Sequence, residues 1–479
     1  MNTPVRTPKP HWTQLVFQLL PFADAASADL PLPRLLRLSL FQFSVGMAMV
    51  LLNGTLNRVM VVELGTPTWL VALLIAVPLF AAPFRALIGY KSDTHRSVLG
   101  WRRVPYIWFG TMMQFGGLAI MPFALLLLDV PERFEIGLVA ATAAFLLTGT
   151  GFHVTQTAGL ALATDLAPED KRPRAVALLY VMLLVGMMFA AFVIGGVLAD
   201  YSATKLVQVI QGCALLTIIL NVTALWKQEA RNPAATAPQR ATATFGAIWQ
   251  AFVTDGRNAR LLTAIGIGAA GFAMQDALLE PYGGEILGLS VGATTGLTGA
   301  WALGSLVGFM LSGRALARGW DPLRLAGAGL VVGINAFLLV LFAGPFGAPL
   351  MLYAGALGIG LGLGLFSVGT LMEAMSLARA ETAGLALGAW GAVQATCAGL
   401  GIAIGGLMRD GVAALLQSGD AAASLAMRAT GYGAVYILEI AFLLVGLAAI
   451  GPLVGHRRHL HPDAGDPLDQ PFGLAEFPT

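Results

Sequence analysis

Long apolar runs constrain this chain more than any other feature. Crossing the hydrocarbon core of a membrane takes about 20 mostly apolar helical residues, and the charged clusters leave room for twelve such runs. We expect them at residues 35–62, 67–88, 104–128, 136–164, 174–199, 204–226, 259–288, 290–313, 322–343, 348–377, 381–408 and 429–455. The sequence therefore predicts an all-α integral membrane protein with twelve transmembrane helices.

Composition agrees with this class. Of the 479 residues, 57% are hydrophobic and only 11% are charged, whereas a soluble domain has about 25% charged residues. The two cysteines, Cys213 and Cys397, show no metal-ligand or redox spacing, and we expect them to be packing residues. No nucleophile, metal cluster or cofactor motif stands out. We therefore expect that the protein is not an enzyme. We also expect it to contact the lipid bilayer and not to bind nucleic acid.

The basic residues indicate the orientation. All but five of the 28 Lys and Arg residues fall on one side when alternate loops are taken together, and the five exceptions are Arg58, Arg133, Lys205, Arg409 and Arg428. Lys and Arg are retained in cytoplasmic loops, so we expect both termini to be cytoplasmic. The N-terminal segment has no signal peptide pattern. Within it, residues 11–20 could form a short helix on the membrane surface.

A polar, basic linker near the middle divides the chain. We expect an N-terminal segment at 1–34, six-helix bundles at 35–226 and 259–455, a cytoplasmic linker at 227–258 and a tail at 456–479. The halves resemble each other, because residues 51–65 align with residues 278–292 at an offset of 227. Two six-helix pseudo-repeats with cytoplasmic termini are the plan of major facilitator superfamily transporters.

Charged residues at the expected cytoplasmic helix ends form a second group. Gly89 and Asp93 fit the Gly-x-x-x-Asp element that usually follows span two in that plan, and they would latch two helices together. Simple topogenic charge explains the same loop equally well. We expect a cytoplasmic charge network made by Asp93, Arg96, Asp165, Arg314 and Glu373.

Four long motifs go beyond the general plan. They are PLPRLLRLSLFQFSVGMAMVLLNGTLNRVMVVEL (31–64), FRALIGYKSDTHRSVLGWRRVPYIW (84–108), HVTQTAGLALATDLAP (153–168) and MQDALLEPYGGEILGLS (274–290). These closely resemble the PucC and LhaA proteins of purple phototrophic bacteria, the bacteriochlorophyll delivery family, and the resemblance covers nearly all of residues 22–455. Overall similarity favours the LhaA branch, which serves the core antenna, over the PucC branch, which serves the peripheral antenna.

The resemblance implies a light-harvesting antenna assembly factor that hands bacteriochlorophyll a to antenna polypeptides, and it leaves a carotenoid open as a second cargo. It further implies core-antenna polypeptides and the reaction centre as partners, with pigment-synthesis enzymes and the membrane insertion machinery as further ones. The place would be the inner or intracytoplasmic photosynthetic membrane. The bare pattern of charges favours an alternative, a proton-coupled transporter of a small amphipathic solute.

A pigment handler needs an apolar site with few polar groups and a ligand for the magnesium of its cargo. His153 is the only histidine inside a predicted span, and Gly149 and Gly151 would leave room for a bulky neighbour. A histidine hydrogen-bonded between helices, with help from Gln156, is the structural alternative. Further candidates for pigment binding are Gln156 itself and the polar residues of spans one and seven: Asn53, Asn57, Gln275 and Asp276.

The charged residues near the outer end of span seven suggest a periplasmic gate. The repeat places Arg58 opposite Glu285, so we expect Arg58 to pair with Glu285 or Glu280. From Leu261 to Glu280 is roughly 28 Å at about 1.5 Å per residue, so these charges could instead lie in the headgroup layer without partners. Pro281 and the two glycines after Tyr282 predict a helix break or hinge in this segment of span seven.

Overall fold

The computed structural model describes residues 30–80, 84–85, 88, 92, 101–168, 172–229, 256–376, 383–416 and 421–454. The expected surface helix at residues 11–20, most of the linker, the tail, Gly89, Asp93 and Arg96 lie outside these residues.

Helices make up almost all of the described chain. In order they are α2 (Leu32–Met49), α3 (Thr68–Phe80), α5 (Val104–Leu128), α6 (Phe134–Leu166), α7 (Arg172–Val197), α8 (Ala203–Leu225), α10 (Gly256–Ala273), α11 (Leu279–Glu285), α12 (Val291–Ala317), α13 (Pro322–Ala343), α14 (Pro349–Ser376), α15 (Ala383–Leu415) and α16 (Ala421–Ile450). Short 3-10 turns follow α5 (Pro131–Arg133) and α16 (Gly451–Leu453). In this part of the chain, eleven helical segments are long and apolar enough to cross a membrane, and α3 is a shorter apolar helix. The predicted all-helical membrane fold is confirmed.

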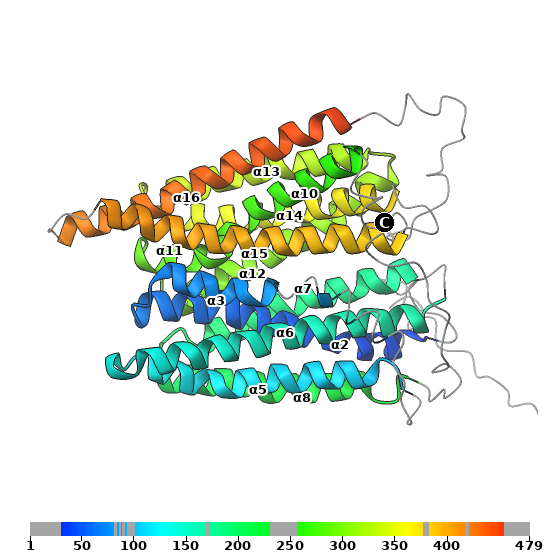
Figure 1. Ribbon diagram of the computed structural model, residues 1–479, viewed down its shortest axis with the longest axis horizontal. Helices are drawn as coiled ribbons and strands as arrows, with labels where there is room; N and C mark the ends of the chain where they lie inside the picture. Colours follow the sequence, from blue (N-terminus) through cyan, green and yellow to red (C-terminus); the bar gives the residue numbers. More distant parts are fainter. Residues whose placement is uncertain are drawn as a thin grey trace, which may run out of the picture.

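The helices form two groups that lie side by side. Helices α2 to α8 pack mainly with one another, as do α10 to α16. The groups meet where α3 contacts α15 and where α7 contacts α12 (Figure 1). We call these groups the N-terminal half and the C-terminal half. The end of the bundle where α2 begins and α16 ends is called the termini side, and the opposite end is called the far side.

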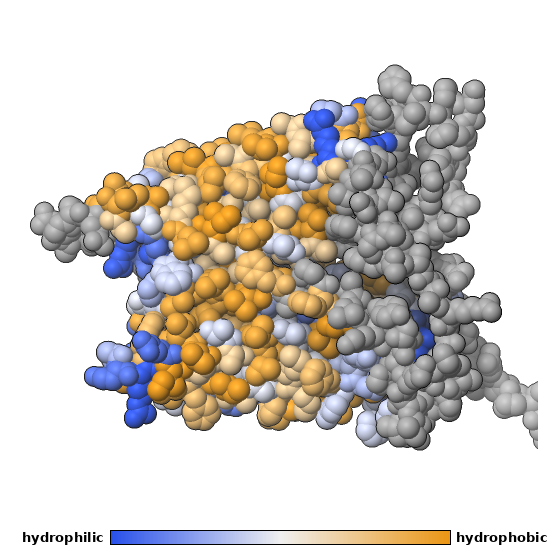
Figure 2. Space-filling model, in the orientation of Figure 1, coloured by the Kyte–Doolittle hydropathy of each residue, from blue (hydrophilic) through white to orange (hydrophobic). Residues whose placement is uncertain are grey.

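The outer surface of the bundle is apolar. Figure 2 shows hydrophobic residues over most of the visible flank, with hydrophilic residues toward its two ends. The exposed fractions are large for Phe123 (65%), Val139 (71%), Phe192 (77%) and Leu350 (81%). A water-soluble monomer rarely exposes contiguous apolar surface on this scale, so this flank faces lipid.

Spans one and seven are both irregular along their length. After α2, span one continues as two π-helical segments, η2 (Val50–Leu56) and η3 (Val59–Glu63). Span seven passes from α10 through the 3-10 segment η7 (Met274–Ala277) into α11. Shifted by the repeat offset, η2 falls on residues 277–283, which overlap η7 only at Ala277 and otherwise lie mainly in the regular helix α11. The irregular part of span seven therefore ends at about the position where that of span one begins.

The helix break in span seven lies one turn earlier than the sequence predicts. Pro281 is the third residue of α11, and the first turn of a helix tolerates proline because its N–H groups have no intrahelical acceptor. The prediction that Pro281 and the glycines interrupt the helix is therefore wrong in position. The interruption instead falls at Gln275 and Asp276.

Glycines bring the two halves into close contact toward the far side. A Cβ atom on Gly292 would lie 2.3 Å from the carbonyl oxygen of Gly195, and a Cβ atom on Gly406 would lie 2.4 Å from the Cβ of Ala72. Small residues at such positions let membrane helices approach closely. The contacts α7 to α12 and α3 to α15 therefore depend on glycine.

Candidate functional site

A buried polar cluster lies inside the N-terminal half. The guanidinium of Arg85 donates to Gln156 Oε1 at 2.9 Å and to Thr157 Oγ1 at 3.1 Å. The side chain of Gln156 in turn donates to Gln42 Oε1 at 3.2 Å. This links α2, α6 and the segment after α3. Among the described residues, the acceptors of the Arg85 guanidinium are thus a neutral amide and a hydroxyl group.

His153 lies on α6 one turn before Thr157, beside this cluster. Its side chain is buried, and neither ring nitrogen has a hydrogen-bond partner within the described structure. The alternative in which His153 is hydrogen-bonded between helices with help from Gln156 is therefore not realised, because Gln156 binds Arg85 and Gln42.

The glycines before His153 serve a different purpose from the one predicted. A Cβ atom on Gly149 would lie 2.3 Å from the Cβ of Pro78, and one on Gly151 would lie 2.6 Å from the backbone nitrogen of Gln114. These glycines let α6 pack against α3 and α5. The expectation that they leave room for a bulky neighbour is wrong, since helices already fill that space.

A second polar group joins spans one and seven across the two halves. Asn57, which is completely buried, donates to the backbone carbonyl of Asp276 at 3.2 Å. Gln275 donates to the carboxylate of Asp276. Asn53 is half-buried in η2 and makes none of the hydrogen bonds found in the described part of the chain. Three of the polar candidates of these spans, Asn57, Gln275 and Asp276, are thus brought together.

Glu280 is enclosed by protein next to this group. Its side chain is 3% exposed, and its Oε1 accepts a hydrogen bond from Thr298 of α12. A Cβ atom on Gly54 would lie 2.3 Å from that same oxygen. Span one can pass this carboxyl only because residue 54 has no side chain.

The predicted pairing of Arg58 with Glu285 or Glu280 is not formed. Arg58 makes an ion pair with Glu63, five residues along the same span, and donates to the backbone carbonyl of Leu289 at 3.3 Å. The wide turns of η2 and η3 allow the pair with Glu63.

Glu63 also acts on Tyr201, which lies in the loop between α7 and α8. Burial raises the pKa of the Tyr201 hydroxyl, and the negative charge of Glu63 adds to this effect.

Glu285 has other partners. Its carboxylate makes an ion pair with Arg409 of α15 and accepts a hydrogen bond from the hydroxyl of Tyr432 at 3.2 Å. The guanidinium of Arg409 lies 4.6 Å from the centre of the Tyr432 ring and donates to Asp410 at 2.6 Å. Arg428 lies 3.8 Å from the same glutamate. These five residues form the far-side charge cluster, which ties together α11, α15 and α16.

The termini side has its own ion pairs. Arg102 and Arg103 donate to Asp165 at 3.1 and 3.0 Å, and Arg257 donates to Glu373 at 2.9 Å. Arg314 is exposed, and neither of these described carboxylates binds it. Asp165 and Glu373 therefore do pair with basic residues near helix ends, but with partners that were not predicted.

Glu439 was missed at the sequence level. It lies in α16 and is completely buried, and both of its carboxyl oxygens lack a partner within the described structure. Its signal is plain in AVYILEIAFLL, where one carboxyl interrupts an apolar run. Arg85 was noticed only as a basic residue and not as the centre of a polar cluster.

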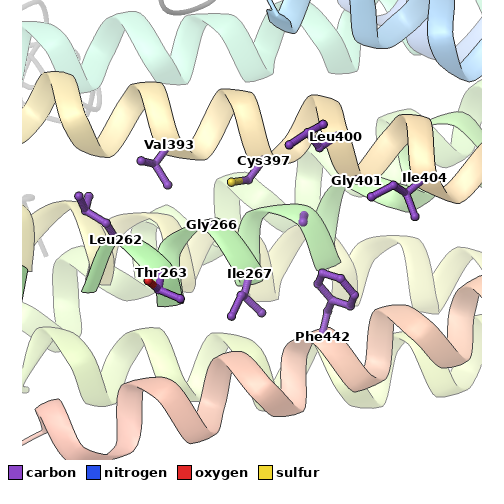
Figure 3. Close-up of a pocket in the computed structure, with 11 residues that line it drawn as sticks. Leu262, Thr263, Gly266, Ile267, Val393, Cys397, Leu400, Gly401, Ile404 and Phe442 are labelled. Carbon is purple, nitrogen blue, oxygen red and sulfur yellow. The ribbon is translucent and has the colours of Figure 1, made fainter. Parts of the chain in front are cut away.

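A cavity of about 450 Å³ lies apart from these polar groups, between α10, α15 and α16 (Figure 3). Figure 3 shows Leu262 and Ile267 of α10 opposite Cys397 and Ile404 of α15, with Phe442 of α16 beside them. Thr263 contributes the hydroxyl group among the residues that line it. None of the predicted site residues reaches this cavity.

Similar proteins agree with the fold and specify the family. The PUCC protein family matches residues 55–458. A protein of Rhodobacter capsulatus, described as an uncharacterized protein in the puhA-bchM intergenic region, is 51% identical over 471 residues, which cover 97% of this chain and 98% of that protein. The protein PucC of Rhodovulum sulfidophilum is 55% identical over 405 residues, covering 82% of this chain and 89% of the relative.

Among solved structures, the nucleoside transporter NupG is similar with a TM-score of 0.62 at 14% identity, over 87% of this chain and 99% of that chain. Identity this low speaks for the fold alone, which is the predicted major facilitator fold. Two findings establish the family. The PUCC family matches residues 55–458, and the two relatives above are at least half identical to this chain over most of their length. The chain belongs to the PucC family of membrane proteins, which is linked to light-harvesting assembly.

Proposed function

We propose that this protein binds bacteriochlorophyll a as cargo and hands it to antenna polypeptides of the core light-harvesting complex. Membership of the PucC family supports a role in antenna assembly. The choice of the core antenna rests on the nearly full-length match to the Rhodobacter capsulatus protein, which covers 97% of this chain, because identity alone, 51% to that protein and 55% to PucC of Rhodovulum sulfidophilum, does not separate the two branches. The place of action would be the photosynthetic membrane, with both termini on the cytoplasmic side.

His153 is the observation that supports pigment binding. A buried imidazole with no hydrogen-bond partner leaves a nitrogen lone pair free, and such a nitrogen can occupy the axial position of a pigment magnesium. Arg85, Gln156 and Thr157 add hydrogen-bond donors beside it, which suit the keto and acetyl oxygens of the cargo. The donor set therefore fits a bacteriochlorophyll.

Access to this site requires one movement. The ring nitrogens of His153 are shielded from solvent, and Pro78 of α3 packs against Gly149 on the same helix. In this proposal α3 and the segment that carries Arg85 swing away from α6 when pigment enters. Arg85 then exchanges its bonds to Gln156 and Thr157 for bonds to the cargo.

The test is the absorption spectrum of the protein purified in mild detergent from a pigment-making host. We expect bound bacteriochlorophyll in the wild type and a loss of at least about tenfold for His153→Phe, equivalent to about 1.4 kcal/mol. His153→Asn keeps a donor atom and should retain part of the pigment. Asn335→Leu, on an exposed face of α13, is the control and should bind as the wild type does. Equal pigment in the wild type and in His153→Phe would refute the assignment.

A further inference from the structure

The C-terminal half contains buried oxygen atoms without partners on one face of α16. Tyr436 and Glu439 are three residues apart and so lie on the same side of the helix. Both are completely buried, and neither the Tyr436 hydroxyl nor either carboxyl oxygen of Glu439 has a partner at hydrogen-bonding distance and angle in the described chain. The backbone N–H of Gln275 lies near the Glu439 carboxyl without meeting these limits. A buried polar group left without a partner is costly, and a buried carboxyl in this position lowers that cost by binding a proton.

Glu439 lies beside the irregular part of span seven. Helix α16 packs against α10 and η7, and a Cβ atom on Gly271 would lie 3.5 Å from the backbone carbonyl oxygen of Glu439. Glu439 is close enough to Asp276 for the two carboxyl groups to interact electrostatically. Asp276 is half-buried, whereas Glu439 has no exposed surface. Asp276 is therefore the more accessible acid of the two.

No described cation neutralises this pair of acids. The sequence has no lysine from Leu261 to Val454, and Arg409 is engaged with Glu285 and Asp410. The neighbouring elements offer few other titratable or charged groups: Asp276 on η7, Glu280, Tyr282 and Glu285 on α11, Arg428, Tyr432 and Tyr436 on α16 itself, Cys397, Arg409 and Asp410 on α15, and, near the first turns of α10 and α13, Arg257, Arg260 and Arg324. Tyr282 packs edge-on against Tyr436, with ring centres 5.3 Å apart.

We propose that Asp276 and Glu439 form a proton-binding site in which Asp276 exchanges protons with its accessible surroundings and Glu439 stores one. A proton from water adds to a carboxylate oxygen of Asp276 and then moves to a carboxylate oxygen of Glu439, which leaves Asp276 ionised again. A proton is favoured over a metal ion because the described residues contain no group of three or more metal-ligating side chains.

The site is connected to the contact between the two halves. The backbone carbonyl of Asp276 accepts the hydrogen bond from Asn57 of span one, so the residue that exchanges protons also joins the N-terminal half. Loading the site changes the charge at this junction. The inference does not depend on pigment binding, and it stands or falls separately from the proposed function.

The test is infrared difference spectroscopy of the full-length protein in lipid nanodiscs as the pH is varied. We expect a carboxylic acid C=O band at neutral pH that is lost in Glu439→Gln, shifted in Asp276→Asn and unchanged in Glu132→Gln, which alters an exposed residue. Subtracting the Glu439→Gln spectrum from that of the wild type cancels the contribution of the other buried acid, Glu280.

Two outcomes would overturn the proposal. One is a band that persists unchanged in Glu439→Gln. The other is a band that responds to added sodium ions at constant pH, which would show a cation site instead. If Glu439→Gln does not fold, Asp276→Asn decides the question, since an unchanged band in that variant would rule out coupling between the two acids.

Discussion

The carboxylate of Asp410 accepts a hydrogen bond of 2.7 Å from the backbone N–H of Trp69. Asp410 belongs to α15 in the C-terminal half, whereas Trp69 lies in the first turn of α3 in the N-terminal half. The first N–H groups of a helix lack partners within it, and here the opposite half supplies one. The start of α3 is therefore capped only while the halves touch at the far side.

Removing this cap should weaken the contact between the halves. We predict that Asp410→Ala lowers stability by about 1 kcal/mol, as the loss of a helix cap usually does, and lengthens the distance between spin labels at Glu132 and Phe346, which are exposed far-side residues of opposite halves. Asp321→Ala is the matched control, because Asp321 caps α13 within its own half. Asp321→Ala should lower stability by about 1 kcal/mol and leave the distance unchanged. Asp410→Ala should cost somewhat more than this control, because it also removes the ion pair with Arg409. An unaltered distance in Asp410→Ala would contradict the prediction.

The far-side charge cluster should respond strongly to the loss of its central cation. Arg409→Leu leaves Glu285 buried beside Tyr432, and breaking a buried pair in this way costs about 3–5 kcal/mol. The double variant Arg409→Leu/Glu285→Leu should recover much of that loss, since Glu285, the buried acid, is removed together with Arg409. Asp410 and Arg428, which lose these partners as well, are more exposed. Thermal unfolding in detergent measures both effects, with Arg314→Leu as the exposed control. A double variant less stable than Arg409→Leu would argue against the pair.

A variant in which the charges of Arg58 and Glu285 are exchanged tests whether these two residues pair. The sequence suggested that such a swap restores a lost pair, but in the structure the partner of Arg58 is Glu63. We therefore predict that Arg58→Glu/Glu285→Arg is at least as unstable as either single variant. Recovery of wild-type thermal stability in this double variant would restore the sequence-based pairing.

The crossing of span one with Glu280 should tolerate no side chain at residue 54. In Gly54→Ala the new methyl group would lie 2.3 Å from Glu280 Oε1 and 2.8 Å from Thr298 Oγ1, and overpacking of this kind costs about 1–3 kcal/mol. Adding Glu280→Ala should reduce the cost by making room. Gly116→Ala is the control, because nothing lies within 4 Å of its Cβ position, and thermal unfolding should show it neutral or slightly stabilised. Equal stability of the two alanine variants would refute the prediction.

Glu229 should hold the first turn of α5. Its carboxylate accepts hydrogen bonds from the backbone N–H groups of Arg102 at 2.6 Å and of Val104 at 2.9 Å, where negative charge also suits the helix dipole. We predict that Glu229→Ala costs about 1 kcal/mol and speeds hydrogen exchange of those amides. The amides at the start of α13, which Asp321 caps, should exchange as before. Unchanged exchange at Val104 would show that the cap contributes nothing.

The sequence predicted the helices well because apolar length is a local property. The bounds expected for two spans, 104–128 and 322–343, are those of α5 and α13. Polar partners could not be read in the same way. The choice of Glu63 over Glu285 by Arg58 depends on the π-helical path of span one, and neither the hydropathy nor the charge pattern signals that path.

The sequence predicted which residues belong to the candidate site better than it predicted their contacts. His153 and Asp276 were singled out because polar groups are rare inside spans, and both lie at buried or half-buried polar positions in the structure. The same reasoning applied to α16 would have found Glu439. Gly149 was misread because a glycine that accommodates a ligand and one that accommodates a neighbouring helix look identical in sequence; only the position of Pro78 distinguishes them.

The meeting of Gly195 and Gly292 has a mechanical consequence. Backbone faces backbone at this point, so no side chains interlock and no rotamer has to change when one half tilts against the other. The two helices can therefore stay in contact at this point while one half rotates against the other. A branched side chain at either glycine would push the two helices apart and restrict the angle between the halves.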